Sequence, residues 1–225
     1  MVHGTNANVL LMEADSTLED SSSLTEEFGK KLATNLVTSR SVMLSSNMIL
    51  HSSVKVGDTV KNTDYLAIFE ESGGLEIFDK YDDETQELLS KLNRKTPKAK
   101  YTGTIVDIDI YYSCDLETVH DSVKSVILPL IKSKKDKAKF ASESRQKTRY
   151  TMPAALPVGT KYKGVEFGED TILLVYYISH EVDHVTGDKL VIGNQLKSTT
   201  MGVMKVPPVT ESGVQIDCIF SSAVS

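Results

Sequence analysis

The chain has 225 residues, of which 40% are hydrophobic and 25% charged, as expected of an ordinary globular protein with one large or two small domains. A formal net charge of −6 argues against a free-standing, nonspecific nucleic-acid binder, and no apolar run reaches the roughly 18 residues that a membrane span requires. The N-terminus does not resemble a secretion signal, and two cysteines without CxxC spacing indicate a reducing, cytoplasmic compartment rather than a disulfide scaffold.

The first part of the chain is expected to alternate short strands with helices. Apolar runs predict strands over residues 8–12, 42–50 and 65–70, with a Gly-Asp turn over 55–59. Three leucines and one phenylalanine at helical spacing predict a helix over 24–36, where Ser23 and Glu26 resemble a capping box. A second, short amphipathic helix is predicted over 84–92.

The second part contains the clearest strands. Residues 102–112 alternate apolar and polar positions, which predicts a strand, and residues 116–131 have helical spacing that Pro129 is expected to kink or end. A connector over 152–163, a buried strand over 171–179 and a last strand over 214–220 follow. The pattern predicts a β-rich α+β protein with strands at both ends and a more helical insert between them.

Charge is distributed in two blocks. Residues 64–87 hold nine carboxylates against one lysine, a net charge of −8, and residues 132–149 hold eight basic residues against two carboxylates, a net charge of +6. Such blocks are usually solvated surface, and otherwise they mark a partner protein or a nucleic acid. A noncatalytic, charged interaction module is therefore one possible function.

His180 to His184 spell HExxH, the pattern of zinc metalloproteases. A zinc protease needs this pattern on a helix, so that both imidazoles reach one metal while the glutamate polarises the bound water. Here the preceding residues are β-branched and aromatic, and Gly187 ends any helical pattern after one turn. We therefore expect a strand end rather than a zinc site, with a metalloprotease as an alternative.

Lys189 and Lys197 stand eight residues apart in GDKLVIGNQLK, residues 187–197, which we interpret as a loop. Two ammonium groups on one preorganised loop suit phosphate oxygens, although solvated surface lysines give the same pattern. Upstream, Glu19 and Asp20 lie in a serine-rich stretch. Adjacent carboxylates can serve a hard cation such as Mg²⁺, and they can also cap a following helix.

Taken together and in order, these stretches resemble the β subunit of multisubunit DNA-directed RNA polymerases. Residues 8–21 resemble the family's N-V-x-V-A-F-M-P-W-x-G-Y-N-F-E-D-S, with Glu19 and Asp20 at its Glu-Asp. Residues 56–66, 101–108 and 214–219 resemble its G-D-x-L-V-G-K, G-x-V-x-G-T-V-I-D-V and P-V-D-I-V-L-N-P segments. In the family's G-D-K-M-A-G-R-H-G-N-K-G the two lysines are also eight residues apart, so Lys189 and Lys197 match without a gap.

The sequence departs from the family in places that matter. Gly193, Asn194 and Gln195 replace the Arg-His-Gly core of the lysine segment, and Ser198 stands where the family has glycine. The aromatic residues before Glu19 are missing, and one residue is deleted there. The chain thus resembles a divergent member of the kind that large bacteriophages encode, as a fragment or as one piece of a split subunit.

The resemblance implies a double-psi β-barrel assembled from residues 1–70 and 165–225, with a flap-like module containing helices inserted over 71–164. It implies that Lys189 and Lys197 contact the RNA 3′ end and the phosphates of the incoming nucleotide, and that Glu19 and Asp20 lie near the nucleotide-borne Mg²⁺. The metal-chelating aspartate triad would belong to a β′-like partner subunit, since Asp107 and Asp109 alternate on a strand and are read as structural. We therefore expect a nucleotidyltransferase component that is inactive alone. It would act with other β fragments, a DNA template, RNA and nucleoside triphosphates, without a membrane, in the host cytoplasm or packaged in a virion.

Overall fold

The computed structural model describes residues 4–12, 20–71, 82, 84, 91, 93–143, 152–193 and 195–221. The chain forms two compact units: unit 1 comprises residues 1–36 and 181–225, and unit 2 comprises residues 37–180. The boundaries predicted at residues 70 and 164 both fall inside unit 2. The observed boundaries, at residues 36 and 180, differ from the predicted ones because the long strands β3 and β12 extend into unit 2 and pair with each other there.

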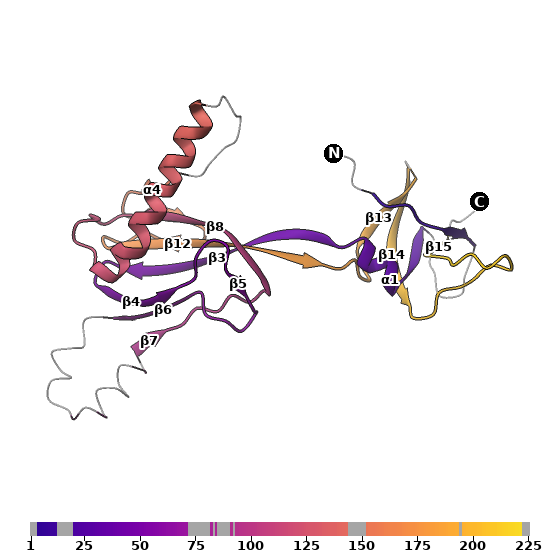
Figure 1. The fold of residues 1–225 in the computed structure, drawn as a ribbon, viewed down its shortest axis with the longest axis horizontal. Coiled ribbons are helices and arrows are strands. Elements are labelled where there is room, and N and C mark those ends of the chain that lie inside the picture. Colours follow the sequence, from indigo (N-terminus) through magenta and orange to yellow (C-terminus); the bar gives the residue numbers. More distant parts are fainter. Residues whose placement is uncertain are drawn as a thin grey trace. The chain divides into compact units, whose positions relative to one another are not determined.

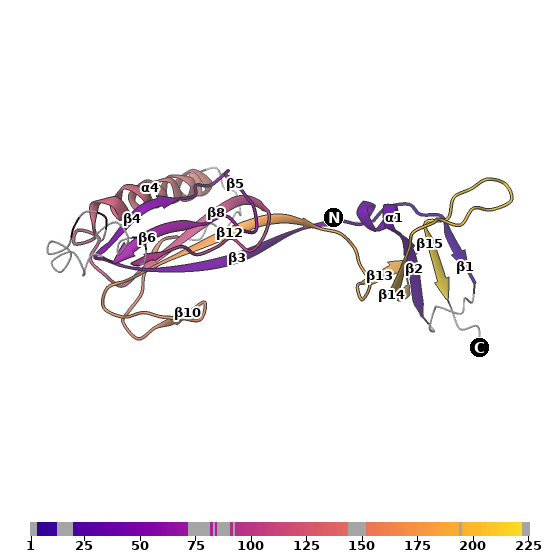
Figure 2. The same ribbon diagram turned by 90° about the horizontal axis from the view of Figure 1, so that it is seen from below.

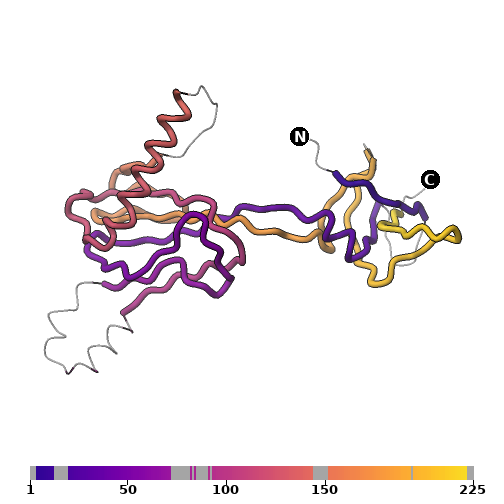
Figure 3. Tube along the Cα trace, in the orientation of Figure 1, coloured from indigo at the N-terminus to yellow at the C-terminus, as the bar shows by residue number. Residues whose placement is uncertain are grey.

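Unit 1 contains a five-stranded sheet that draws strands from both ends of the chain. Its order is β1 (Val9–Leu11), β15 (Cys218–Ser221), β2 (Ser21–Thr25), β14 (Leu196–Met204) and β13 (Lys189–Ile192). β1 is parallel to β15 and β2 is parallel to β14, whereas the other two pairings are antiparallel. Figure 3 shows the indigo start and the yellow end of the chain running together in this unit. The described strands leave the sheet open, with β1 and β13 at its edges.

The single described helix of unit 1, α1 (Glu26–Lys31), is much shorter than predicted. Thr25 is its N-cap, with Oγ1 accepting a hydrogen bond from the amide of Phe28 at 3.2 Å. Leu24 instead belongs to β2, where it is buried opposite Cys218. The predicted helix over 24–36 is therefore wrong at both ends, because pairing with two neighbouring strands outweighs the local helical spacing.

Unit 2 is built on two sheets. One has the order β3 (Thr34–Ser45), β12 (Thr171–Val182), β8 (Gly103–Tyr112) and β5 (Thr59–Val60), with β9 (Ala154–Ala155) paired to β8. The other has the order β4 (Met48–Ser53), β6 (Ala67–Glu71) and β7 (Arg94–Lys95), and a two-stranded hairpin joins β10 (Lys161–Tyr162) to β11 (Val165–Glu166). The strand predicted over 42–50 is thus divided between β3 and β4 by a turn, whereas the strands predicted over 102–112 and 171–179 are confirmed.

Helix α4 (Asp121–Glu143) covers one face of the sheet that contains β12 and β8, and the β10 hairpin lies on the opposite face of that sheet (Figures 1 and 2). On the helix side, Val123, Ile127 and Ile131 join the main apolar core with β8 and β12. On the hairpin side, Tyr162 and Val165 pack on a smaller cluster around Phe167. The two faces of the sheet are thereby both buried, which explains why β12 reads as a continuous apolar run.

Pro129 neither ends α4 nor separates it into two helices, in contrast to the sequence-based expectation. A proline in a helix removes the hydrogen bond to the carbonyl four residues earlier, here that of Ser125. Both residues are exposed, so water can satisfy this carbonyl. The helix consequently continues through much of the predicted lysine-rich tail. The helix predicted over 84–92 lies almost wholly outside the described residues.

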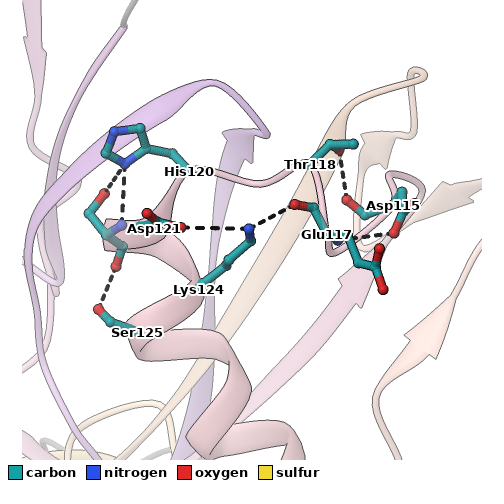
Figure 4. Close-up of polar contacts among 8 residues, drawn as sticks. Asp115, Glu117, Thr118, His120, Asp121, Lys124 and Ser125 are labelled. Atoms are coloured by element: carbon teal, nitrogen blue, oxygen red, sulfur yellow. Dashed lines mark hydrogen bonds and ion pairs between the residues drawn. The ribbon is translucent and has the colours of Figure 1, made fainter.

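The first turn of α4 is fixed by a cluster of polar contacts (Figure 4). Nδ1 of His120 accepts a hydrogen bond from the amide of Ser122 at 3.2 Å and lies 2.8 Å from the Ser122 hydroxyl. The Ser122 hydroxyl in turn accepts the amide of Leu50 at 2.9 Å, at an irregularity in β4. Lys124 pairs with Asp121 at 3.6 Å and donates to the carbonyl of Glu117 at 2.7 Å. These bonds join the helix start to the neighbouring sheet.

Neither helix of the described residues combines the length and apolarity needed to cross a membrane.

Candidate functional site

Lys189 and Lys197 lie on one β-hairpin of unit 1, formed by β13 and β14. Lys189 pairs with Thr199, and Lys197 pairs with Val191. Directly paired residues of antiparallel strands share a face, so the two lysines are diagonal neighbours on the same face, at about 7 Å between backbone positions. Both side chains are exposed. The sequence-predicted pair is therefore brought together, although by a hairpin and not by the expected loop.

The hairpin forms because alternate residues of β13 contact the core. Leu190 and Ile192 face the cluster of Leu24, Phe28 and Cys218, while Lys189 and Val191 occupy the opposite face. The loop prediction for residues 187–197 is wrong, since it gave weight to Gly193 and Asn194 and none to this alternation. Gly193 lies instead at the tip of the hairpin, with φ of +61°.

A β-bulge at Gly187 begins the hairpin. The amide of Gly187 donates to the carbonyl of Thr200 at 2.7 Å, and the amide of Thr200 donates to the carbonyl of Asp188 at 2.8 Å. Gly187 and Asp188 thus both lie opposite Thr200. Gly187 has φ of +97°, as in a β-bulge whose first residue is a left-handed glycine. A carboxylate oxygen of Asp188 also accepts the amide of Val185 at 2.9 Å. Together these bonds set the direction in which Lys189 leaves the turn.

Asp20 lies directly before β2, the strand next to β14. Its carbonyl accepts the amide of Thr199 at 3.3 Å, so it lies within two residues of Lys197 along the neighbouring strand. Lys189 lies one strand further, about 10 Å from Asp20 at the usual strand spacing. Asp20 has φ of +56°, a left-handed conformation that aspartate tolerates better than most residues. Glu19, its predicted companion, lies outside the described residues.

The site combines two exposed lysines with two aspartates, Asp20 and Asp188. Within the described chain, neither Lys189 nor Lys197 has a carboxylate ion-pair partner. If the two ammonium groups are as far apart as their backbone positions, about 7 Å, they repel by about 0.6 kcal/mol at the dielectric constant of water, and salt screens the repulsion further. A phosphate between them would convert that repulsion into two attractions. The pair is thus suited to a group with several anionic oxygens.

The described residues contain no cluster of three or more histidine, cysteine, aspartate or glutamate side chains that could hold a metal ion. Asp20 offers one carboxylate near the lysines, and Mg²⁺ is commonly bound by one or two carboxylates together with substrate phosphates and water. Asp20 alone does not make a metal site among the described residues.

The HExxH residues are not on a helix: the first three end strand β12, and Asp183 and His184 follow it without regular structure. His180 and Glu181 belong to β12, which confirms the sequence-based expectation. His180 stacks on Tyr101 with 4.6 Å between ring centroids. His184 instead bonds through Nε2 to the hydroxyl of Thr200 at 2.7 Å, beside the hairpin bulge. The geometry departs from the helical arrangement that a zinc protease requires, and His184 supports the lysine hairpin.

Comparison with protein-family models and with curated proteins finds no match to this chain. The lysine hairpin must therefore be interpreted from its own residues.

Unit 2 contains a buried ionic network that was not predicted from the sequence. Lys134 of α4 is buried and bonds to the carboxylates of Asp107, at 2.9 Å, and of Asp109. Asp109 also accepts the hydroxyl of Tyr177 at 2.9 Å. Burial, reinforced by this hydrogen bond to a carboxylate, raises the pKa of Tyr177 above the usual tyrosine value. The available signal was the pair of alternating aspartates in an otherwise apolar strand, because a buried carboxylate requires a cationic partner.

A second tyrosine contact involves Tyr111, which lies on β8 like Asp107 and Asp109. The hydroxyls of Tyr111 and Tyr162 are 2.8 Å apart, and the rings pack with 4.3 Å between centroids. Burial and this hydrogen bond raise the pKa of Tyr111. The contact joins the β10 hairpin to the sheet, so we assign it to stability.

Proposed function

We propose that this chain is part of the catalytic core of a DNA-directed RNA polymerase, as a divergent β-like subunit or a piece of one. The observation that carries the proposal is the lysine hairpin. Lys189 and Lys197, which match the family's two lysines in spacing, lie on one exposed face of β13 and β14 and beside Asp20. Three residues that are up to 177 positions apart in sequence are thus close neighbours in unit 1.

In this role the two lysines bind the phosphates of the incoming nucleotide and the RNA 3′ end. RNA extension is an in-line phosphoryl transfer, in which the protein mainly positions the reacting groups and offsets developing charge. Lysine serves as a compact point charge there, and the hairpin fixes the backbone positions from which both side chains extend. Asp20, with Glu19, would lie near the nucleotide-borne Mg²⁺, which neutralises charge on the phosphates. An aspartate triad on a β′-like partner would chelate the catalytic metal, so the chain alone is inactive.

The arrangement of unit 1 supports the finer proposal of a double-psi β-barrel with an inserted flap-like module. Two parallel pairings, β1 with β15 and β2 with β14, join the start of the chain to its end. Unit 2 is one continuous insertion between these parts. Unit 1 would correspond to the barrel and unit 2 to the module.

The test is RNA extension by a polymerase reconstituted with a β′-like subunit that carries the aspartate triad. Lys189→Ala and Lys197→Ala together should lower the extension rate by about 100-fold or more, the scale for removing preorganised charge stabilisation. Lys205→Ala is the matched control, since Lys205 is an exposed lysine of the same unit just after β14. Unchanged extension by the double variant would eliminate the proposal.

The charged interaction module is the second candidate. Exposed lysines on the second half of α4 favour it: Lys132, Lys135, Lys137 and Lys139. This function predicts salt-sensitive binding of a partner that survives the loss of Lys189 and Lys197 and is weakened by substitution of the α4 lysines. The same set of variants therefore separates the two functions.

A further inference from the structure

A groove of about 850 Å³ runs along the outer edge of β13. Residues 189–193 line one part of it, and residues 4–7 with Val9, at the other end of the sheet order, line another. Phe28, Leu32, His184 and Cys218 complete its described lining. The groove is thus bordered by both open edges of the five-stranded sheet.

The outer edge of β13 has unused hydrogen-bonding groups. Within the described chain, β14 is the strand that pairs with β13, and no described strand pairs on its other side. The carbonyl of Asp188 accepts a hydrogen bond from the amide of Thr200 in β14. Along an antiparallel strand, every second residue directs its amide and carbonyl to the same neighbouring strand. Leu190 and Ile192 therefore direct their peptide groups to β14, whereas Lys189 and Val191 direct theirs into the groove.

The apolar floor of the groove is incompletely covered. Leu24, Phe28 and Cys218 are buried, but the residues around them, among them Ala7, Leu32, Leu190 and Ile192, are only partly so. An apolar surface of this kind gains free energy when further apolar side chains cover it. A bare apolar ligand would cover the floor but leave the peptide groups of the edge unpaired, whereas an extended strand satisfies both.

The charge of the groove indicates which peptide sequences would bind there. Among the described residues of the lining, Lys189 is the only lysine, arginine, aspartate or glutamate, so this part of the lining is cationic. A carboxylate on the added strand opposite Lys189 would form a favourable cross-strand pair. Residues of that strand that face Leu190 and Ile192 would be apolar, in alternation.

We propose that an extended segment of another polypeptide binds in this groove by adding a strand to β13. Its sequence alternates apolar residues, which cover the floor, with outward residues that include a carboxylate opposite Lys189. The peptide groups of Lys189 and Val191 supply the hydrogen bonds of the new ladder. This inference does not depend on the proposed polymerase function, because it uses the edge of β13 and not phosphate binding.

The test is selection from a random 12-residue peptide library displayed on yeast, with the full chain as target. We expect peptides with alternating apolar residues and at least one carboxylate, and binding should slow amide hydrogen exchange at Lys189 and Val191. Val191→Pro removes the outward amide without removing a bond to β14, so it should weaken binding by about 10-fold or more. Val191→Ala keeps the amide and should bind within about threefold of the original chain.

Circular dichroism of the Val191→Pro variant checks that it folds, and the exchange measurement on the unaltered chain stands without any variant. Failure to select peptides would overturn the proposal, as would peptides that leave exchange at both amides unchanged. A concentration-dependent dimer abolished by Val191→Pro would assign the edge to a second copy of this chain and also overturn it.

Discussion

Substitution of Lys134 by methionine should destabilise unit 2 strongly. Methionine has a similar length, so the change removes a charge and leaves little cavity. Asp109 is 2% exposed, and within the described chain it would keep only the hydroxyl of Tyr177 as a side-chain partner. Breaking a buried ion pair from one side costs about 3–5 kcal/mol, and the remaining hydrogen bond favours the lower end of this range.

Urea unfolding followed by circular dichroism at 222 nm measures this effect. α4, with 23 residues, is by far the longer of the two helices in the described chain, so the signal reports on unit 2. The sequence has no tryptophan, which makes the helical signal preferable to fluorescence. With an m value of about 2 kcal/mol/M, a loss of about 3 kcal/mol lowers the urea midpoint by about 1.5 M.

Two control variants test the reasoning. Asp109→Asn combined with Lys134→Met removes both charges, and it should recover a large part of the lost stability because no unpaired charge stays buried. Lys161→Met removes an exposed partner of Glu166, at 3.3 Å, and should change the free energy of unfolding by less than about 1 kcal/mol. A Lys134→Met variant as stable as the original chain, or a double variant no more stable than the single one, would refute this account.

Three further outcomes are expected. Gly103→Ala should lower the thermal midpoint more than Gly187→Ala, because the Cβ added at residue 103 would lie 2.2 Å from a backbone oxygen. The Cβ added at residue 187 would meet no atom within 4 Å, so only the φ of +97° opposes that substitution, by about 1–2 kcal/mol. Equal effects in thermal unfolding would contradict these local geometries. Burial raises the pKa of Cys218 to about 11, so at pH 8 its thiol should react with Ellman's reagent about 100-fold more slowly than in the urea-unfolded chain, and the rate should rise with pH towards 11. A rate independent of pH between 8 and 10 would argue against it. His120→Ala should cost α4 about 1 kcal/mol by removing its cap, whereas His120→Asn should restore most of it, as judged by urea midpoints; an asparagine variant no better than alanine would exclude the capping role.

The parts of the fold that the sequence predicts well are those where local pattern and tertiary environment agree. Residues 103–112 alternate polar and apolar side chains and form β8, and the apolar run before His180 forms the buried β12. The Gly-Asp turn also forms, with Gly57 at φ of +99° and a carboxylate oxygen of Asp58 accepting the amide of Lys55 at 2.7 Å. Each of these features depends on neighbouring residues alone.

The misses occur where distant pairing decides. Ser21 to Leu24 have weak strand propensity, yet they form the centre of the unit 1 sheet because β14 and β15 lie on either side. At the candidate site, the spacing of Lys189 and Lys197 was informative, but their common face depends on the register of β13 with β14. That register is set by the bulge at Gly187, which local sequence indicates only as a turn.

The pairing of β2 with β14 also determines the order in which the protein can form during synthesis. Ser21 pairs with Thr199, which lies 178 residues later in the chain. At about 5–20 residues per second, the ribosome needs roughly 10–35 s to supply that partner. Unit 2, a continuous segment of residues 37–180, is complete earlier and can fold while β2 still waits for its neighbours. The candidate site is therefore among the last parts of the molecule to assemble.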